Sequence, residues 1–215
     1  VQTCALPISR QKKAIPISEL HMLLNKDPQS EKLRRTQAIA NLLFQFCGMP
    51  FSDLAHLEKS NLERGLLKYN RTKTGTPMSI EVLESAQNAI GGLYNKSDAR
   101  SSGYPDYLFR ILSGAYKRNE EGAYREYQSA LRRFNNELKS LSRKLRLHSP
   151  VTSYTLRHSW ATTAKYRGVP IEMISESLGH KSIKTTQIYL KGFELEERTK
   201  VNKLNYSYVC NFKML

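Results

Sequence analysis

Hydrophobic residues spaced three and four apart run through most of this chain and predict that it is mainly helical. The stretch 31–47 repeats this spacing and predicts one mostly buried helix, followed by a turn at 48–50. In the segment 16–20, Pro16 and Ser18 come before an apolar run, which predicts that an earlier helix starts there. Shorter helices are expected around 52–57 and over 82–94.

A small sheet is expected between these helices. Residues 66–73 and 76–80 flank Thr74-Gly75, and this arrangement predicts a β-hairpin with its turn at that dipeptide. Residues 95–106 are rich in Ser, Gly, Asp and Pro and predict an exposed loop. The expected fold is mainly α with one small antiparallel β-sheet, in the α+β class.

The clearest periodicity predicts a long helix near 124–145. Its apolar face is formed by residues at alternating steps of three and four, namely Tyr124, Tyr127, Leu131, Phe134, Leu138, Leu141 and Leu145. Its other faces are basic and carry Arg125, Arg132, Arg133, Lys139, Arg143, Lys144 and Arg146. These cations form either a solvated surface or a set of phosphate contacts, and the sequence leaves both interpretations open.

The charge of the chain indicates a polyanionic partner. Lysine and arginine total 34 against 19 acidic residues, a net charge of +15, which suits nucleic acid or an anionic membrane surface. No apolar run approaches the roughly 18 residues that span a bilayer, and no signal peptide is visible. The three cysteines have no metal-ligand spacing, and their odd number argues against a disulfide framework. A reducing cytoplasm is therefore expected.

The stretch 152–190 carries the candidate chemistry. Ser153 is expected to cap a helix that begins at Tyr154. A second short helix over 171–178 should end at Gly179 as its C-cap.

This second helix places His180 at a chain reversal. Tyr189 follows nine residues later, after a polar segment at 181–187 that is expected to be exposed.

The motifs of this stretch resemble the tyrosine recombinase (phage integrase) family. The matching strings are Leu156-Arg157-His158-Ser159-Trp160-Ala161-Thr162, then Leu178-Gly179-His180, then Thr185-Thr186-Gln187-Ile188-Tyr189. Each string alone is a weak signal, but their order and spacing together are specific. The resemblance covers about 16–197, and the strings GMPF-D-L and SY-RHSWAT are similar to integrases of Bacteroides-type mobile elements.

The resemblance implies a role for each motif residue. Tyr189 would be the nucleophile that attacks a DNA phosphate and forms a covalent intermediate. Arg157 and His180 would bind the phosphate oxygens on which negative charge develops. Lys73, at the hairpin turn, would protonate the departing 5′ oxygen. A phosphotyrosine conserves the bond energy for rejoining, so neither a metal nor ATP nor another cofactor is implied.

Each of these residues also has a structural alternative. Tyr189 could be a surface aromatic, His180 a helix cap, Arg157 a partner in a structural salt bridge, and Lys73 part of a solvated turn. For His158 and Trp160, core or supporting roles are expected instead of direct chemistry.

Two positions depart from the family pattern. Pro50 stands where the family has an arginine, and losing one charge-stabilising donor can cost on the order of a hundred- to a thousand-fold in rate. We favour Arg71 as the replacement, because alternation along a strand would direct it to the same side as Lys73. Arg35, on the preceding helix, is the second candidate.

The other departure is Tyr154, where the family commonly has histidine. A spacing of three places Tyr154 and Arg157 on one helical face. The phenol can donate a hydrogen bond to phosphate, but an ordinary tyrosine pKa near 10 makes it a poor base. Tyr154 also rivals Tyr189 as the nucleophile on chemistry alone, and the family spacing favours Tyr189.

The resemblance sets the expected organisation and partners. Residues 1–15 would be a truncated or foreign N-terminal segment, 16–197 the catalytic domain, and 198–215 a C-terminal tail that is a candidate for subunit contact. The amphipathic stretch 193–204 would either pack on a neighbouring subunit or fold back on its own domain.

The expected activity is site-specific recombination for integration or excision of a mobile element. It would act on double-stranded DNA, as a homotetramer, with accessory DNA-bending proteins in some reactions, in the bacterial cytoplasm at the nucleoid and without a membrane. The main alternative is a catalytically impaired relative that only binds DNA. A type IB topoisomerase and a plain helical DNA-binding module are further alternatives.

Overall fold

The computed structural model describes residues 14–93, 106–190, 199 and 202–207, and for Tyr189 it describes the backbone alone. Most of the expected N-terminal segment at 1–15, most of the expected loop at 95–106 and most of 193–204 lie outside the described residues. The helices are α1 (Ile17–Asn25), α2 (Glu31–Gln45), α3 (Phe51–Ala55), α4 (Glu84–Leu93), α5 (Glu121–Lys144), α6 (Ser153–Tyr166), α7 (Ile171–Ser177) and α8 (Ile183–Leu190). None of the helices in these ranges is long and apolar enough to cross a membrane.

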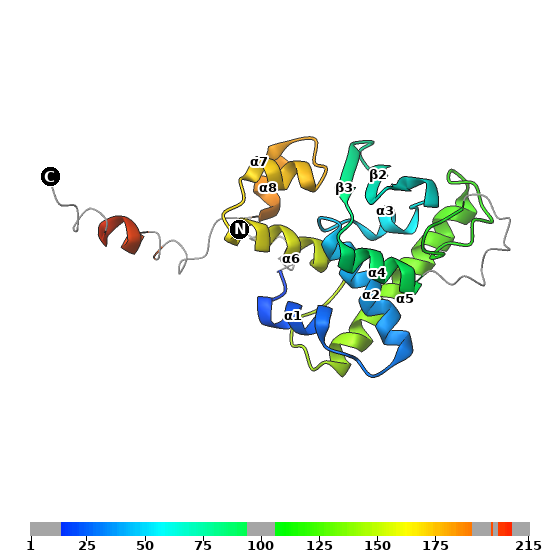
Figure 1. The fold of residues 1–215 in the computed structure, drawn as a ribbon, viewed down its shortest axis with the longest axis horizontal. Coiled ribbons are helices and arrows are strands. Elements are labelled where there is room, and N and C mark those ends of the chain that lie inside the picture. The colour runs from blue at the N-terminus through cyan, green and yellow to red at the C-terminus, as the bar shows by residue number, and fades with distance from the viewer. Residues whose placement is uncertain (1–13, 94–105, 191–198, 200–201, 208–215) are drawn as a thin grey trace, which may run out of the picture.

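Helix α2 lies at the centre of the fold, with α1, α4, α5 and α6 packed around it (Figure 1). The periodic residues that predicted this helix are buried in the main core: Ile39, Leu42, Leu43 and Phe46. Burying a side chain of this size contributes roughly 1.5–3 kcal/mol. The prediction of a mainly helical fold around one buried helix is therefore confirmed.

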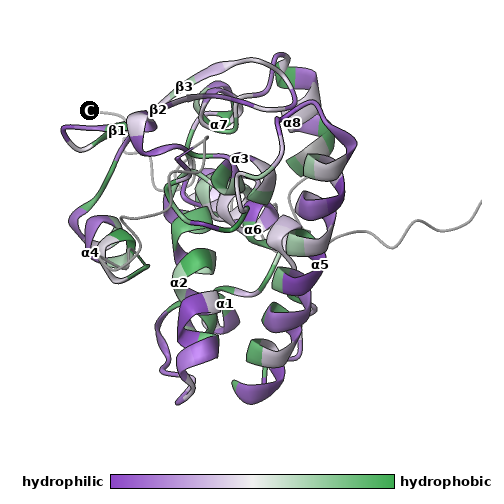
Figure 2. Ribbon diagram, turned by 90° about the vertical axis from the view of Figure 1, so that its right-hand side faces the viewer, coloured by the Kyte–Doolittle hydropathy of each residue, from purple (hydrophilic) through white to green (hydrophobic). Residues whose placement is uncertain are grey.

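Helix α5 runs along one side of the molecule and carries many hydrophilic residues along its length (Figure 2). Phe134, Leu138 and Leu141 of its apolar stripe are buried, as predicted. Tyr124, at the start of the stripe, is instead 63% exposed. The contacts of α5 with α3 are made further along the stripe, where Phe51 lies against the rings of Tyr127 and Phe134.

The expected hairpin forms, but with different limits. A three-stranded antiparallel sheet has the order β1-β2-β3, with β1 at Leu62–Glu63, β2 at Leu66–Asn70 and β3 at Pro77–Glu81. The short strand β1 was not predicted. The register ends at the pair Asn70↔Pro77.

The turn is consequently 71–76, longer than the predicted Thr74-Gly75. Within it, the Arg71 N–H donates to the Thr76 carbonyl at 2.9 Å, and the Gly75 N–H donates to the Arg71 carbonyl at 2.8 Å.

Helix α6 begins one residue earlier than predicted, so the assignment of Ser153 as its cap is wrong. Thr152 is the N-cap, with extended backbone and a hydroxyl that accepts from the Thr155 N–H at 3.2 Å. The Thr155 hydroxyl in turn accepts from the Thr152 N–H, which completes a capping box. The Ser153 N–H donates to the side-chain carbonyl of Asn135 on α5, and this bond ties the start of α6 to the long helix.

A second, smaller core joins α6 to the pair α7 and α8. It consists of Ala161, Ile174, Leu178 and Leu190, with Trp160 packed against it. Gly179 ends the α7 segment with a φ of +64°, as its predicted C-cap role requires. This arrangement places the turn between α7 and α8 beside the β2–β3 hairpin (Figure 1).

Candidate active site

A cleft of about 700 Å³ opens where the hairpin turn, α3, α5, α6 and the α7–α8 turn meet. Five of the six predicted site residues line it: Arg71, Lys73, Tyr154, Arg157 and His180. Lys181 adds a further cation, and no carboxylate lines the cleft within the described part of the chain. Such a concave, cationic surface favours an anionic ligand.

Arg157 reaches the floor of this cleft from the first turns of α6. It is 6% exposed, and its guanidinium donates to the Gly48 carbonyl at 2.9 Å and to the Leu178 carbonyl at 2.6 Å. Gly48 lies so close that an added Cβ would be 3.2 Å from the Arg157 Cα. The glycine therefore allows the chain to pass close enough for its carbonyl to hold Arg157.

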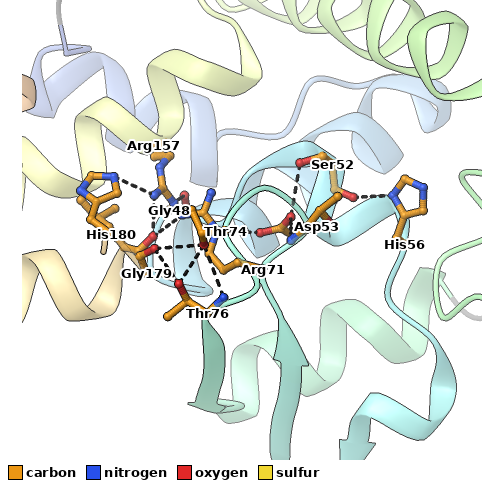
Figure 3. Close-up of polar contacts among 12 residues, drawn as sticks. Gly48, Ser52, Asp53, His56, Arg71, Thr74, Thr76, Arg157, Gly179 and His180 are labelled. Atoms are coloured by element: carbon orange, nitrogen blue, oxygen red, sulfur yellow. Dashed lines mark hydrogen bonds and ion pairs between the residues drawn. The ribbon is translucent and has the colours of Figure 1, made fainter. Parts of the chain in front are cut away.

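Arg71 meets Arg157 from the opposite side (Figure 3). It is 7% exposed, its Nε donates to Asp53 Oδ2 at 3.0 Å, and its Nη1 donates to the same Leu178 carbonyl that Arg157 uses. Asp53 is itself 2% exposed, so this is a buried ion pair. Two guanidinium groups from distant parts of the chain thus converge on one carbonyl.

The locations of Arg71 and Arg35 favour Arg71 as the replacement for the arginine that is absent at Pro50. Pro50 and Arg71 both line the cleft, whereas Arg35 is exposed on α2, does not line it and donates to the Phe109 carbonyl at 3.5 Å. The strand alternation from which Arg71 was predicted does not apply, however, because strand β2 ends at Asn70 and both Arg71 and Lys73 lie in the turn.

His180 lies between Arg157 and Thr186. Its Nε2 is 3.3 Å from an Arg157 nitrogen, and its Nδ1 is 2.8 Å from the Thr186 hydroxyl. Because a guanidinium can only donate, this hydrogen bonding assigns the ring proton to Nδ1. Thr186 is fully buried, whereas the other residues of 181–187 are exposed, as predicted.

The charge state of His180 follows from its surroundings. Burial first, and then the positive charges of Arg157, Arg71 and Lys73, lower the pKa of His180 to about 4. The imidazole is therefore neutral at pH 7. In the absence of an anion it accepts a hydrogen bond from Arg157, in contrast to the donor role expected from the sequence.

Tyr154 shares the cleft side of α6 with Arg157, as its spacing predicted. Tyr154 is 41% exposed, and its ring lies edge-on to that of His158, with ring centroids 4.8 Å apart. His158 does not line the cleft, which fits its expected supporting position.

Fewer contacts define the positions of Lys73 and Tyr189 than those of the other site residues. Lys73 is exposed in the turn and lines the cleft, and no hydrogen bond or ion pair of its ammonium is seen among the described residues. The backbone of Tyr189 lies in α8, whose first turn borders the cleft at Thr185. Its hydroxyl lies outside the described atoms.

Asp53 and Lys181 are site residues that the sequence analysis missed. Asp53 stands in the same string as Pro50, but nothing local marks it as the partner of Arg71, which lies 18 residues away. Lys181 follows His180 directly, and that adjacency was the only sequence signal for it.

Comparison with curated proteins places this chain among recombinases. It is 29% identical to the probable integrase/recombinase protein MJ0367 of Methanocaldococcus jannaschii, over 86% of this chain and 54% of the relative. It is 30% identical to tyrosine recombinase XerD of Halalkalibacterium halodurans, over 84% of this chain and 57% of the relative. The chain thus spans little more than half the length of these relatives.

Solved structures share the fold. A crystal structure of XerA recombinase superposes with a TM-score of 0.62 at 22% identity, covering 98% of this chain and 68% of that one. The Tn1549 transposon integrase in complex with a circular intermediate DNA superposes with a TM-score of 0.61 at 15% identity, over 91% of this chain and 67% of that one.

Substitution of Gly179 tests the contact between the α7–α8 turn and Arg71. Gly179 and Gly168 have φ values of +64° and +77°, so alanine at either costs about 1–2 kcal/mol of backbone strain. Only at Gly179 would the new Cβ approach Arg71 Cδ to 2.5 Å and Met78 Sδ to 2.8 Å. We expect Gly179→Ala to lower the free energy of unfolding in urea by about 1–3 kcal/mol more than Gly168→Ala. Equal losses would contradict the close approach.

A family model completes these comparisons. The model described as the phage integrase family matches residues 14–195, a span that includes the hairpin, the α6 arginine, the α7–α8 turn and Tyr189. The chain therefore belongs to the phage integrase family, the tyrosine recombinases.

Proposed function

We propose that this chain is the catalytic domain of a site-specific DNA recombinase, which breaks and rejoins DNA strands through a 3′-phosphotyrosine at Tyr189. The observation that carries the proposal is the convergence of Arg71 and Arg157 on the Leu178 carbonyl, at the floor of a cleft lined with cations. Two fixed guanidinium groups and an adjacent imidazole match the charge of a phosphodiester in its transition state.

In this mechanism the phosphate binds against Arg157 and Arg71. Both side chains are held in place before the ligand arrives, by Gly48 and Leu178 for Arg157 and by Asp53 and Leu178 for Arg71. Donors that are already oriented need no reorganisation as charge develops, and that is the main source of electrostatic catalysis. Arg71 thereby supplies the positive charge that Pro50 does not.

The bond changes balance without a cofactor. The Tyr189 oxygen forms a bond to phosphorus while the bond from phosphorus to the 5′ oxygen breaks, and the phenol proton passes to water. The Lys73 ammonium gives a proton to the departing 5′ oxygen, which leaves as a hydroxyl. Rejoining is the reverse reaction, in which a 5′ hydroxyl attacks the phosphotyrosine. Tyr154 donates a hydrogen bond to the phosphate and is not the base.

The partner we propose is double-stranded DNA. The integrase and recombinase structures with this fold include a lambda integrase dimer bound to a core site and XerH bound to its difH substrate. In this proposal the exposed cations of α5 supply phosphate contacts, among them Arg132, Lys139 and Arg143. A polyanion held by several such contacts binds with strong salt dependence.

The wider assignments are part of the same proposal. We place the catalytic domain at 16–197, with the tail at 198–215 as a candidate subunit contact. Recombination would be carried out by a tetramer on two DNA sites, with accessory DNA-bending proteins in some reactions. A bacterial mobile element of the Bacteroides type is the proposed source, and the nucleoid in the cytoplasm the place of action.

Trapping of a covalent protein–DNA product tests the nucleophile. With a nicked suicide substrate, the wild-type chain and Tyr154→Phe should both form a labelled covalent adduct, whereas Tyr189→Phe should form none. Peptide mapping should place the nucleotide on Tyr189. An adduct formed by Tyr189→Phe would overturn the assignment. Binding of DNA without any adduct, even by the wild type, would support the alternative of a protein that only binds DNA.

Arg71 is tested by the cleavage rate on the same substrate. Arg71→Ala should lower the rate on the order of a hundred- to a thousand-fold, as expected for loss of one transition-state donor, and Arg35→Ala should leave it unchanged. Arg71→Ala leaves the buried Asp53 carboxylate without its ion-pair partner. The double variant Arg71→Ala/Asp53→Asn, which removes that charge, is therefore measured beside it. Near-normal cleavage by either Arg71 variant would remove Arg71 from the active site.

The pH dependence of His180 has opposite signs for folding and for DNA binding. Its lowered pKa means that the unfolded state takes up the proton first, so stability present above about pH 6.5 is lost as the pH falls towards 4. A bound phosphate offsets the charge of the nearby cations and raises the pKa of His180. DNA affinity should therefore rise as the pH falls over the same interval.

Anisotropy titrations of labelled DNA and urea unfolding, each from pH 7.5 to 5, measure the two effects. His180→Gln should flatten both curves relative to the wild type. A wild-type affinity that changes with pH no differently from that of His180→Gln would show that the phosphate does not contact His180.

A further inference from the structure

The turn that carries Lys73 is held from two sides by described contacts. On one side, the Thr72 N–H donates to Asp53 Oδ1 at 3.1 Å. On the other side, the Thr74 and Thr76 hydroxyls each lie 3.5 Å from the Gly179 carbonyl. These contacts tie the backbone around Lys73 to α3 and to the α7–α8 turn.

A third contact comes from a part of the chain that the mechanism has not used. Arg118, three residues before α5, donates from Nη2 to the Thr72 hydroxyl at 2.8 Å, across 46 residues of sequence. Thr72 is therefore held twice, through its backbone by Asp53 and through its side chain by Arg118.

The location of Arg118 argues against direct contact with the phosphate. Its side chain is exposed and does not line the cleft. Its described hydrogen bond goes to Thr72, which lies between Arg71 and Lys73 in the turn. Its effect on the chemistry would therefore pass through the turn.

We propose that Arg118 is a positioning residue, which acts through the Thr72 hydroxyl to hold the turn so that Lys73 reaches the departing 5′ oxygen. This inference rests on the proposed function, in which Lys73 is the proton donor. A lysine has a long flexible stem, whereas proton transfer requires an approach of about 2.6–3.2 Å between heavy atoms. Fixing the backbone beside Lys73 removes one source of misplacement.

A substrate with sulfur in place of the 5′ bridging oxygen separates this role from others. When the phosphorus–sulfur bond breaks, the sulfur leaves as a thiolate, because a thiol is far more acidic than an alcohol and needs no proton from Lys73. A defect in proton donation is therefore rescued by the sulfur substrate. A defect in phosphate binding or in the nucleophile is not rescued.

The variants form matched pairs. Thr72→Val removes the hydroxyl that accepts from Arg118 and keeps the backbone N–H, while Thr72→Ser keeps both. Arg118→Ala removes the donor, and Lys117→Ala removes the same charge one residue away. Lys73→Ala gives the full effect of losing the proton donor.

At saturating DNA, Arg118→Ala and Thr72→Val should each cleave the ordinary substrate about ten-fold more slowly than the wild type. This is part of the roughly 10²–10⁴-fold that a general acid contributes. Both should cleave the sulfur substrate at the wild-type rate, and so should Lys73→Ala. Thr72→Ser and Lys117→Ala should match the wild type on both substrates. Combining Arg118→Ala with Thr72→Val should add no further loss, because both remove one contact.

The failures are distinguishable. If the wild type forms no covalent adduct, or if Lys73→Ala is not rescued by sulfur, the proposed function or the proposed role of Lys73 fails. If Lys73→Ala is rescued but Arg118→Ala cleaves normally, or is equally slow on both substrates, the positioning role of Arg118 is overturned. Weaker DNA binding by Arg118→Ala without rescue would assign it to phosphate contact instead.

Discussion

The carbonyl of Leu178 is the point on which the site depends, because it accepts hydrogen bonds from Arg71 and from Arg157. It belongs to the turn between α7 and α8, and the two arginines come from the hairpin and from α6. One acceptor therefore fixes three segments relative to one another. Gly179 makes this approach feasible, since a Cβ there would overlap the Arg71 side chain.

This arrangement brings like charges together, and the fold compensates for that in two ways. Asp53 forms a buried ion pair with Arg71, which offsets the cost of removing that guanidinium from water. His180 stays neutral because burial and the neighbouring cations lower its pKa to about 4. The cleft therefore suits an anion. Its two arginines are already held in place, and a bound anion would favour protonation of the His180 imidazole.

In the function we propose, the same network makes up for the absence of an arginine at Pro50. Arg71, from the hairpin turn, supplies the guanidinium, and Asp53 of α3 holds it. The hairpin turn consequently serves two purposes. Arg71 is buried at its base, while Lys73 is exposed above the cleft, and Thr72 between them is anchored by Asp53 and Arg118.

The sequence by itself determined the helical class, the buried helix α2 and the positions of Arg157, Gly179 and His180, because periodicity and short motifs are local properties of the chain. Only the tertiary structure decided which cation stands beside Arg157, that Thr186 is buried under His180, and that Tyr124 is exposed. The reason is that burial and pairing depend on which segment covers a position. Arg71 and Asp53 are 18 residues apart, and Arg118 and Thr72 are 46 apart, so no local pattern records that they meet.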